Sequence, residues 1–289
     1  MPRYRKHFAW DAYEEPRAPS ADSILELPPL PLPPAHLLDP DSRQQKIIRQ
    51  NPDFFTVWTP LNVDHLRTAF EPHPNKAPVQ SLLHSLRYGF FMPFEDMFLD
   101  DLAEQPQIHE DKQCSNIEVF RNLAQKEIEA NRYSPRFTKL LPYMRLVPQF
   151  AIPKKGTDAL RPISDMTASG FNLGISREAS RVRYDNLIDL GRYLRHLHHY
   201  IGHLEGHLYK CDVSKAYRLL PMHPLVMLLQ VVETYELPSK RSFRIDKFGV
   251  FGNRYKPRLW CIFFGLVVWS LRFHLKIQIP LHYMDDQFG

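Results

Sequence analysis

Apolar residues repeat at helical spacing through the first half of the chain. From Thr59 to about Arg136 the pattern is helical, because residues three and four apart lie on one face of a helix. The apolar positions are Leu82, Leu83 and Leu86, then Ile117, Phe120, Leu123, Ala124 and Ile128. Ser115 precedes the second set and is a candidate N-cap. These segments predict helices that pack against the domain that follows them and contribute no catalytic residues.

A change of period near residue 144 predicts a strand. The run from Met144 to Ile152 suits an extended segment, and Pro153-Lys154-Lys155-Gly156 ends it in a turn. A hairpin at this place carries Lys154 in its turn and Arg161 on its return arm. Such a pair can clamp a triphosphate, the arginine through its planar fork and the lysine as a point charge. The alternative is an exposed, charged turn.

The N-terminal residues 1–45 contain a proline run and no regular repeat of apolar positions. Leu27-Pro28-Pro29-Leu30-Pro31-Leu32-Pro33-Pro34 can form neither a helix nor an inner strand, and it favours an extended polyproline conformation. We therefore expect a disordered Pro-rich tail or linker over 1–45, a helical region over 46–140 and a further domain over 141–289. A proline motif that docks a partner protein is the alternative interpretation.

Two short segments in the second half place carboxylates at the ends of strands. An amphipathic pattern over 187–201 predicts a helix, and the following strand delivers Asp212 where the chain turns toward the next helix. The second segment holds Asp285 and Asp286 behind Tyr283 and Met284. Adjacent aspartates repel, so a cation beside them keeps both ionised, and two such strand ends outline a metal site. The alternative is a solvated acidic turn.

Charge is distributed unevenly along the chain. The net charge is +5, but residues 1–131 hold 13 Lys/Arg against 20 Asp/Glu, whereas residues 132–289 hold 24 against 12. The basic half is the electrostatic footprint of a protein that binds nucleic acid or polyphosphate, although basic solvated faces also occur without such a partner. Three widely spaced cysteines favour a reducing, intracellular compartment, either nucleus or cytoplasm. The apolar run Leu259–Leu271 is shorter than a bilayer requires, so no membrane is expected as a partner.

Taken together, these stretches resemble the fingers and palm of a reverse transcriptase, an RNA-directed DNA polymerase, of the retrotransposon type found in fungal genomes. Four motifs stand in the order of that family, and the resemblance covers about residues 60–289. They are the segment Lys154 to Arg161 with Asp165 and Asn172, the motif Asp212-x-x-x-Ala216-Tyr217-Arg218 with Pro221-x-His223-Pro224, the motif Phe251-Gly252-Asn253-Arg254-Tyr255-Lys256-Pro257, and Tyr283-Met284-Asp285-Asp286.

The resemblance implies an α+β fold, with an antiparallel sheet, packed helices and a partial palm. It implies that Asp212 and Asp285 hold two Mg²⁺ or Mn²⁺ ions, with Asp286 beside them, for nucleotidyl transfer from dNTPs to a primer 3′-hydroxyl. The nucleotide-binding residues it implies are Lys154, Arg161, Tyr217 and Gly252. Lys154 and Arg161 would neutralise the triphosphate, Tyr217 would exclude a 2′-hydroxyl, and Gly252 would admit a close nucleotide or template. The expected partners are an RNA or DNA template with its primer, and dNTPs.

The chain departs from the family pattern in three ways. Tyr255 and Lys256 stand where small residues are commoner, and Trp260 replaces a phenylalanine-like position, changes expected to narrow the nucleotide pocket. The chain also stops three residues after Asp286, so we expect the primer-holding strands and the thumb to be missing and polymerisation to be poor. Two other interpretations therefore stand beside the enzyme: a catalytically inactive remnant that binds nucleic acid, and an interaction protein.

Overall fold

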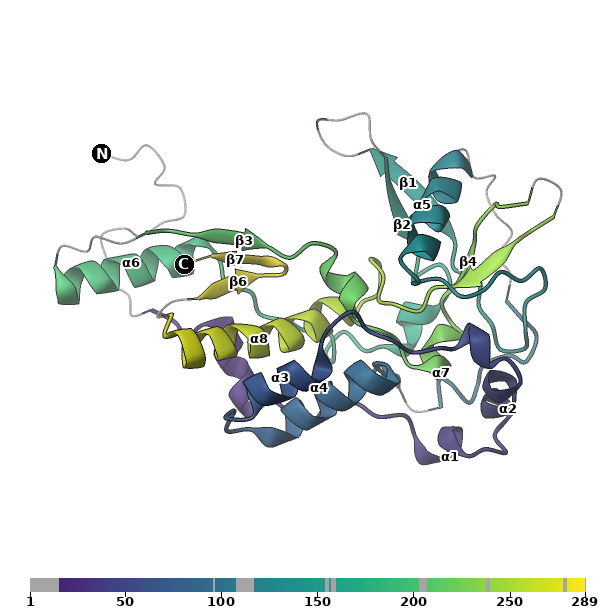
Figure 1. Ribbon diagram of the computed structural model, residues 1–289, viewed down its shortest axis with the longest axis horizontal. Helices are drawn as coiled ribbons and strands as arrows, with labels where there is room; N and C mark the ends of the chain where they lie inside the picture. The colour runs from purple at the N-terminus through teal and green to yellow at the C-terminus, as the bar shows by residue number, and fades with distance from the viewer. Residues whose placement is uncertain are drawn as a thin grey trace.

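Helix α8 (Lys256–Leu275) is the longest helix in the part of the chain that the structure describes, and other elements gather around it (Figure 1). The structure is a computed structural model, which describes residues 16–95, 97–107, 117–153, 156, 160–202, 207–237, 240–277 and 280–288. A small sheet lies on one side of α8, and α3 (Val63–Phe70) and α4 (Lys76–Tyr88) lie on the other. Pro257 occupies the first turn of α8, where its missing N–H leaves no helical hydrogen bond unmade.

By length and composition α8 could cross a membrane, since its mean hydropathy reaches 1.3. The sequence predicted that the apolar run Leu259–Leu271 is too short to cross a bilayer. The helix in the structure is longer than that run. Leu259, Trp260 and Leu266 expose none of their surface, because the N-terminal 3₁₀ helix over 20–26, α3 and the 3₁₀ helix over 216–219 pack against the helix. An all-round apolar helix that neighbouring elements cover in this way is typical of a protein core.

The N-terminal segment packs on this core, so the expectation of disorder is wrong for residues 16–45. A 3₁₀ helix, η1 (Ser20–Glu26), runs along α8, and α1 (Ala35–Leu38) and α2 (Arg43–Gln50) follow it. Ile24 and Leu30 are buried. Proline prevents helix and inner-strand pairing, but it leaves an extended chain free to bury the leucines between the prolines, and this is what the sequence pattern did not reveal.

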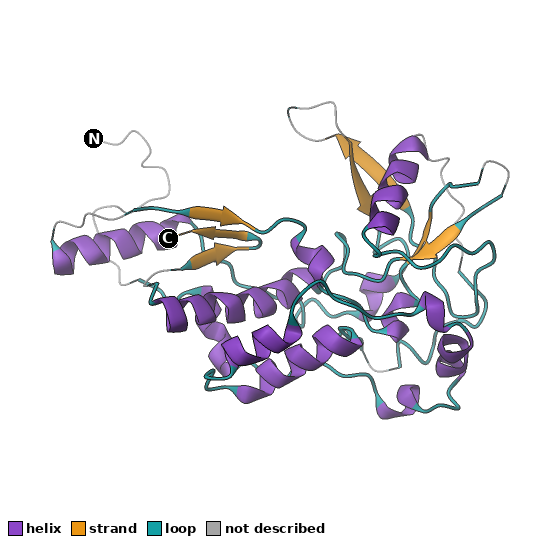
Figure 2. Ribbon diagram, viewed as in Figure 1, coloured by secondary structure: helices purple, strands orange, loops and turns teal. Residues whose placement is uncertain are grey.

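The helical pattern of the first half corresponds to helices in the structure (Figure 2). Leu82, Leu83 and Leu86 are buried in α4. Helix α5 (Ile117–Glu129) buries Phe120 and Ala124, while Ser115, the candidate N-cap, lies outside the described residues. The short helix η2 (Pro52–Phe54) joins α2 to α3. In the second half, α6 (Leu187–Ile201) begins at a capping box in which Asn186 and Asp189 bond each other's backbone N–H groups.

The described strands form three small antiparallel sheets. The hairpin of β1 (Gln149–Pro153) and β2 (Leu160–Ser164) projects from the body of the molecule, as Figure 1 shows. Its first strand begins at Gln149 rather than near Met144, because Pro148 precedes it and Leu146 forms an isolated bridge with Val231 instead. The other strands are β3 (Lys210–Asp212), β7 (Asp286–Phe288) and β6 (Leu281–Tyr283) in one sheet, and β4 (Val231–Glu233) with β5 (Phe243–Ile245) in another.

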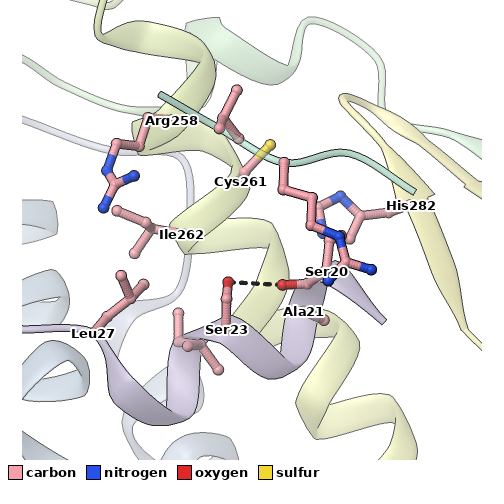
Figure 3. Close-up of a pocket in the computed structure, with 11 residues that line it drawn as sticks. Ser20, Ala21, Ser23, Leu27, Arg258, Cys261, Ile262 and His282 are labelled. Carbon is pink, nitrogen blue, oxygen red and sulfur yellow. Dashed lines mark hydrogen bonds between the residues drawn. The ribbon is translucent and has the colours of Figure 1, made fainter. Parts of the chain in front are cut away.

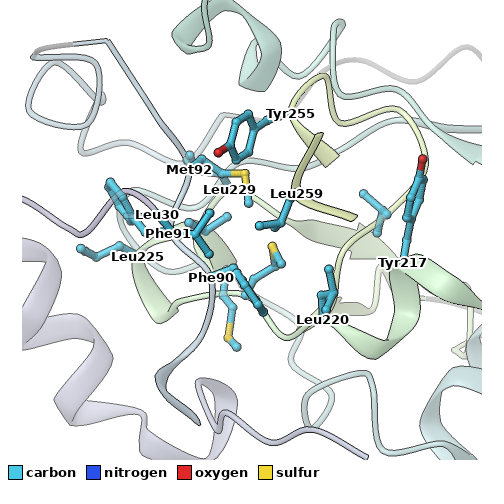
Figure 4. Packing of buried hydrophobic residues seen from close by; sticks show 14 of the residues in the cluster. Leu30, Phe90, Phe91, Met92, Tyr217, Leu220, Leu225, Leu229, Tyr255 and Leu259 are labelled. Carbon is cyan, nitrogen blue, oxygen red and sulfur yellow. The ribbon is translucent and has the colours of Figure 1, made fainter. Parts of the chain in front are cut away.

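One large apolar cluster connects the N-terminal segment with the second half of the chain. Part of it is shown in Figure 4, where Leu30 and Phe90 lie near Leu225 and Leu259. The remaining short elements join this cluster through η3 (Phe171–Gly174), η4 (Ala216–Leu219) and α7 (Pro224–Met227). The helices and small antiparallel sheets confirm the expected α+β class.

Candidate active site

Strands β3 and β7 bring two acidic segments that are far apart in sequence to one end of a sheet. The strands pair antiparallel with Asp212 opposite Asp286, and directly opposed residues project from the same face. The backbone N–H of Val213 donates to the carbonyl oxygen of Asp285 at 3.0 Å. The structure thus places the backbone of Asp212 beside the backbone of both residues of the acidic pair. Their action as metal ligands stays a prediction.

The acidic pair lies at a tight hairpin turn between β6 and β7. Tyr283 pairs with Asp286 across this turn, and Met284 has a φ of +56°. That left-handed conformation costs a residue other than glycine about 1–2 kcal/mol. The buried Trp260 offsets part of this cost, because its indole Nε1 donates a hydrogen bond to the carbonyl oxygen of Met284 at 2.9 Å. Helix α8 therefore holds the turn in place through this hydrogen bond.

Lys210 provides a positive charge next to these carboxylates. It stands two residues before Asp212 in β3, and its Nζ lies 3.1 Å from Oδ1 of Asp286. The lysine side chain is 67% exposed and that of Asp286 is 35% exposed, so salt screens this ion pair. Within the described ranges, no three His, Cys, Asp or Glu side chains come together as a ready-made metal cluster.

Tyr217 packs against the same turn. Its hydroxyl lies 3.6 Å from Sδ of Met284, and its ring centroid is 4.9 Å from that of Phe251. Only 5% of Tyr217 is exposed, whereas 57% of Phe251 is. Burial raises the pKa of the Tyr217 phenol above its ordinary value, and Asp285 adds to the shift. Tyr217 thus stays neutral at physiological pH and supports the turn, while Phe251 presents more of its ring to solvent.

Arg218 anchors the corner that connects β3 to η4. Its guanidinium donates to both carboxylate oxygens of Asp246 at 2.8 Å and to Oε2 of Glu127 at 2.7 Å. Burial by itself would lower the pKa of Arg218, but the two facing carboxylates outweigh it and raise the pKa above its ordinary value. This charged group fixes the backbone immediately after Tyr217. The motif contains the arginine, but nothing in the sequence pointed to Glu127 as its partner.

Gly252 has a backbone conformation that a side chain would disturb. Its φ is +103°, and a Cβ there would lie 2.3 Å from the carbonyl oxygen of Ser164 in β2. Asn172 holds this turn through two bonds: Nδ2 donates to the Gly252 carbonyl at 2.8 Å, and Oδ1 accepts from the Arg254 N–H at 2.9 Å. The close approach that requires glycine is therefore to the strand β2. Contact between Gly252 and a nucleotide stays a prediction.

One of the two predicted triphosphate ligands lies in the projecting hairpin. Arg161 lies in β2 and pairs with Ile152 in β1. Lys154 follows β1 and lies outside the described residues. The two paired strands expected on either side of the turn are present. The clamp that these two residues would form on a triphosphate remains a prediction.

The three residues that depart from the pattern of the resemblance are buried. Tyr255, Lys256 and Trp260 expose at most 4% of their surface, so they fill the core instead of lining an open pocket. The Nζ of Lys256 has no hydrogen-bond partner among the described residues, and the side chain packs tightly against Gly249. Burial lowers the pKa of Lys256 well below its ordinary value, and the charge of Arg218 lowers it further. Only its unusual place in the motif drew attention to this lysine.

The chain matches no protein-family model, and no curated protein matches it. The candidate site therefore depends on the arrangement of its own residues: three aspartates at one sheet end, a fixed turn, an aromatic pair beside it and the adjacent Lys210.

Proposed function

We propose that this chain is the fingers and palm part of an RNA-directed DNA polymerase that transfers nucleotides from dNTPs to a primer 3′-hydroxyl. The observation that carries the proposal is the register of β3 and β7, which sets Asp212 opposite Asp286 and beside Asp285. Other folds also bring aspartates together. Here the order of four motifs, the hairpin β1–β2 and the turn at Gly252 support the same function.

The donor set suits a hard divalent cation. Carboxylate oxygens are the ligands that Mg²⁺ and Mn²⁺ prefer, and Mg²⁺ commonly binds through one or two carboxylates plus water and substrate phosphates. Such a site needs no closed protein cage, so the lack of a three-residue cluster among the described residues is compatible with it. In the proposal Asp212 and Asp285 hold the cations. The bound cations would lower the pKa of the primer 3′-hydroxyl and would neutralise the charge of the leaving pyrophosphate.

The chain's own residues divide the remaining work. The ion pair with Lys210 occupies Asp286, which favours a supporting role for this carboxylate. Lys154 and Arg161 would face the triphosphate, which requires positioning and neutralisation of charge rather than covalent chemistry. Tyr217, five residues after Asp212, would border the sugar.

A second candidate function is nucleic-acid binding without catalysis. The contact of 3.1 Å between Lys210 and Asp286 favours it, because the lysine already supplies a countercharge to the acidic pair. The basic half of the chain would attract phosphates in either case.

Manganese binding and primer extension separate the two candidates. The intact chain, Asp212→Asn and Asp285→Asn are titrated with Mn²⁺ by electron paramagnetic resonance and then assayed on a primed RNA template with dNTPs. Asp64→Asn is the matched control, since Asp64 pairs with Arg67 and Arg87 on the surface of α3 and α4.

Loss of Mn²⁺ binding and of extension in the two site variants alone supports the polymerase. A chain that binds RNA yet takes up no Mn²⁺ and extends no primer is a non-catalytic binder. Equal extension by Asp212→Asn and the intact chain would refute the site.

A further inference from the structure

Asp185 is a fully buried carboxylate next to the strand that leads into the acidic turn. It precedes α6, and its oxygens accept from the Ser20 N–H at 2.7 Å and from the Ser20 hydroxyl at 2.8 Å. It also accepts from the His282 N–H at 3.0 Å, while its own N–H donates to the His282 carbonyl at 3.2 Å. One side chain thus connects the N-terminal segment with β6.

His282 lies at the outer edge of the sheet. Strand β6 pairs with β7 on one side only, and a three-residue edge strand is marginal by itself. On the other side, Asp185 takes the place of a neighbouring strand, since it satisfies both the N–H and the carbonyl of His282. Tyr283 follows directly and opens the turn that carries Asp285. The position of the acidic turn is therefore coupled to Asp185.

The segment that carries Ser20 is itself fixed at several points. Arg183 donates to the carbonyl oxygen of Ala18 at 2.7 Å, and the Tyr193 hydroxyl donates to that of Arg17 at 2.7 Å. Asp22 forms an ion pair with Arg272 of α8. These contacts come from the stretch before α6, from α6 and from α8, so the segment connects α6 with α8.

The packing under this segment is close but not complete. Gly265 of α8 lies against η1, where a Cβ would meet Ala21 at an ordinary contact distance of 3.7 Å. A cavity of about 50 Å³ remains beside η1, and Ser20, Ser23, Cys261 and His282 are among the residues that line it (Figure 3). Burial lowers the pKa of His282, so its ring stays neutral beside this cavity.

We propose that Ser20 and Asp185 are positioning residues for the acidic turn, and that residues 17–27 form a brace for the active site. This role deepens the proposed function and rests on it. The brace acts through the backbone of His282: its loss releases the edge of β6, and the turn with Asp285 loses its fixed place beside Asp212. The N-terminal segment, which the sequence alone assigned to a linker, is then part of the catalytic unit.

Hydrogen exchange measured by mass spectrometry tests the brace without requiring activity. Asp185→Asn keeps the size of the side chain but replaces one acceptor oxygen by an amide N–H₂. This group cannot accept a hydrogen bond from the Ser20 or His282 donor that it then faces. Ser20→Ala removes only the hydroxyl. The matched control is Asp189→Asn, because Asp189 is also buried but bonds within the capping box of α6. We expect exchange of the amides over 281–288 to rise at least tenfold in Asp185→Asn, to rise less in Ser20→Ala, and to stay unchanged in the control.

Three results overturn the brace: no change in exchange over 281–288, the same change in Asp189→Asn, or a uniform rise throughout the chain. Should Asp185→Asn fail to fold, Ser20→Ala decides by the same criterion. A parallel Mn²⁺ titration separates this inference from the proposed function. If exchange is faster in Asp185→Asn but the intact chain binds no Mn²⁺, the brace is supported and the polymerase is refuted. If the intact chain binds Mn²⁺ but exchange is unchanged in Asp185→Asn, only the brace is refuted.

Discussion

The indole Nε1 of Trp260 lies 2.9 Å from the carbonyl oxygen of Met284, so the core helix α8 and the acidic turn share a hydrogen bond. A phenylalanine at this position could fill much of the same volume but could not donate. The unusual tryptophan is thus explained by the turn, whose Met284 has a strained, left-handed backbone.

Replacing Trp260 by phenylalanine should loosen the turn. The loss of one hydrogen bond and a small loss of packing should lower the free energy of unfolding by about 1–2 kcal/mol. Urea denaturation measures this change, and hydrogen exchange shows where it acts. The matched control is Trp269→Phe, since Trp269 stacks on Phe273 near the other end of α8. Faster exchange over 281–288 in both variants would contradict a specific role for Trp260.

Sugar selection should depend on the aromatic pair beside the turn. In an extension assay that shows activity, Tyr217→Ala should reduce discrimination against ribonucleotides by roughly 10- to 100-fold, because it opens volume at the sugar. Tyr217→Phe, which keeps the ring, should preserve it. Phe251 is the competing gate, since much more of its ring is exposed. If Phe251→Ala relaxes selection and Tyr217→Ala does not, the ring of Tyr217 is only a support.

The placement of Asp212 and Asp285 at the ends of strands could be predicted from the sequence, whereas the residues that support the acidic turn could not. Asp212 and Asp285 stand in short motifs at strand ends, and local patterns of this kind survive in any fold that pairs the strands. The bond between Ser20 and Asp185 joins residues 165 positions apart, and no local pattern encodes such a contact. The same holds for Glu127 and Arg218. The proline content also led to the wrong prediction of disorder over residues 16–45. Proline excludes regular hydrogen bonding, but it does not indicate whether the leucines between the prolines are buried.

Lys256 should lower the stability of the fold at neutral pH. Its amine is buried without a partner among the described residues, and such burial costs a polar group about 1–3 kcal/mol. Lys256→Met, similar in volume, should therefore raise the free energy of unfolding by about that amount at pH 7. The contrasting variant is Lys247→Met. Lys247 is also buried, but its Nζ donates to Thr56 at 3.1 Å, so its replacement should not stabilise.

The gain from Lys256→Met should shrink as the pH rises. The pKa of Lys256 is depressed in the folded chain, so between that value and about 10.5 the unfolded chain binds the extra proton. Stability of the natural chain then rises with pH, by up to about 1.4 kcal/mol for each pH unit. Denaturant titrations at pH 7 and pH 9.5 measure the difference between the two chains. A constant difference across this range would show that Lys256 does not titrate in it.

Nucleic-acid binding should depend on salt through the basic half of the chain. Residues 132–289 carry 24 Lys/Arg against 12 Asp/Glu, and each cation that meets a phosphate releases a counterion. With about four such contacts, affinity for single-stranded RNA should fall roughly fiftyfold between 50 and 200 mM salt. Fluorescence anisotropy with a labelled strand measures this slope. The expectation holds whether or not the chain catalyses extension.

Two charge reversals locate the surface that binds. Lys210 and Lys215 are exposed on either side of Asp212, so Lys210→Glu with Lys215→Glu should weaken binding and reduce the salt slope by about 1.4, or 0.7 for each lost phosphate contact. The matched control reverses Lys46 and Arg49, two exposed cations of α2 in the acidic half. Equal losses in both double variants would mean that net charge alone governs binding. A loss of binding confined to the Lys210 and Lys215 variant places the bound RNA strand beside Asp212. A primer terminus would have to lie there for the aspartates to act on it.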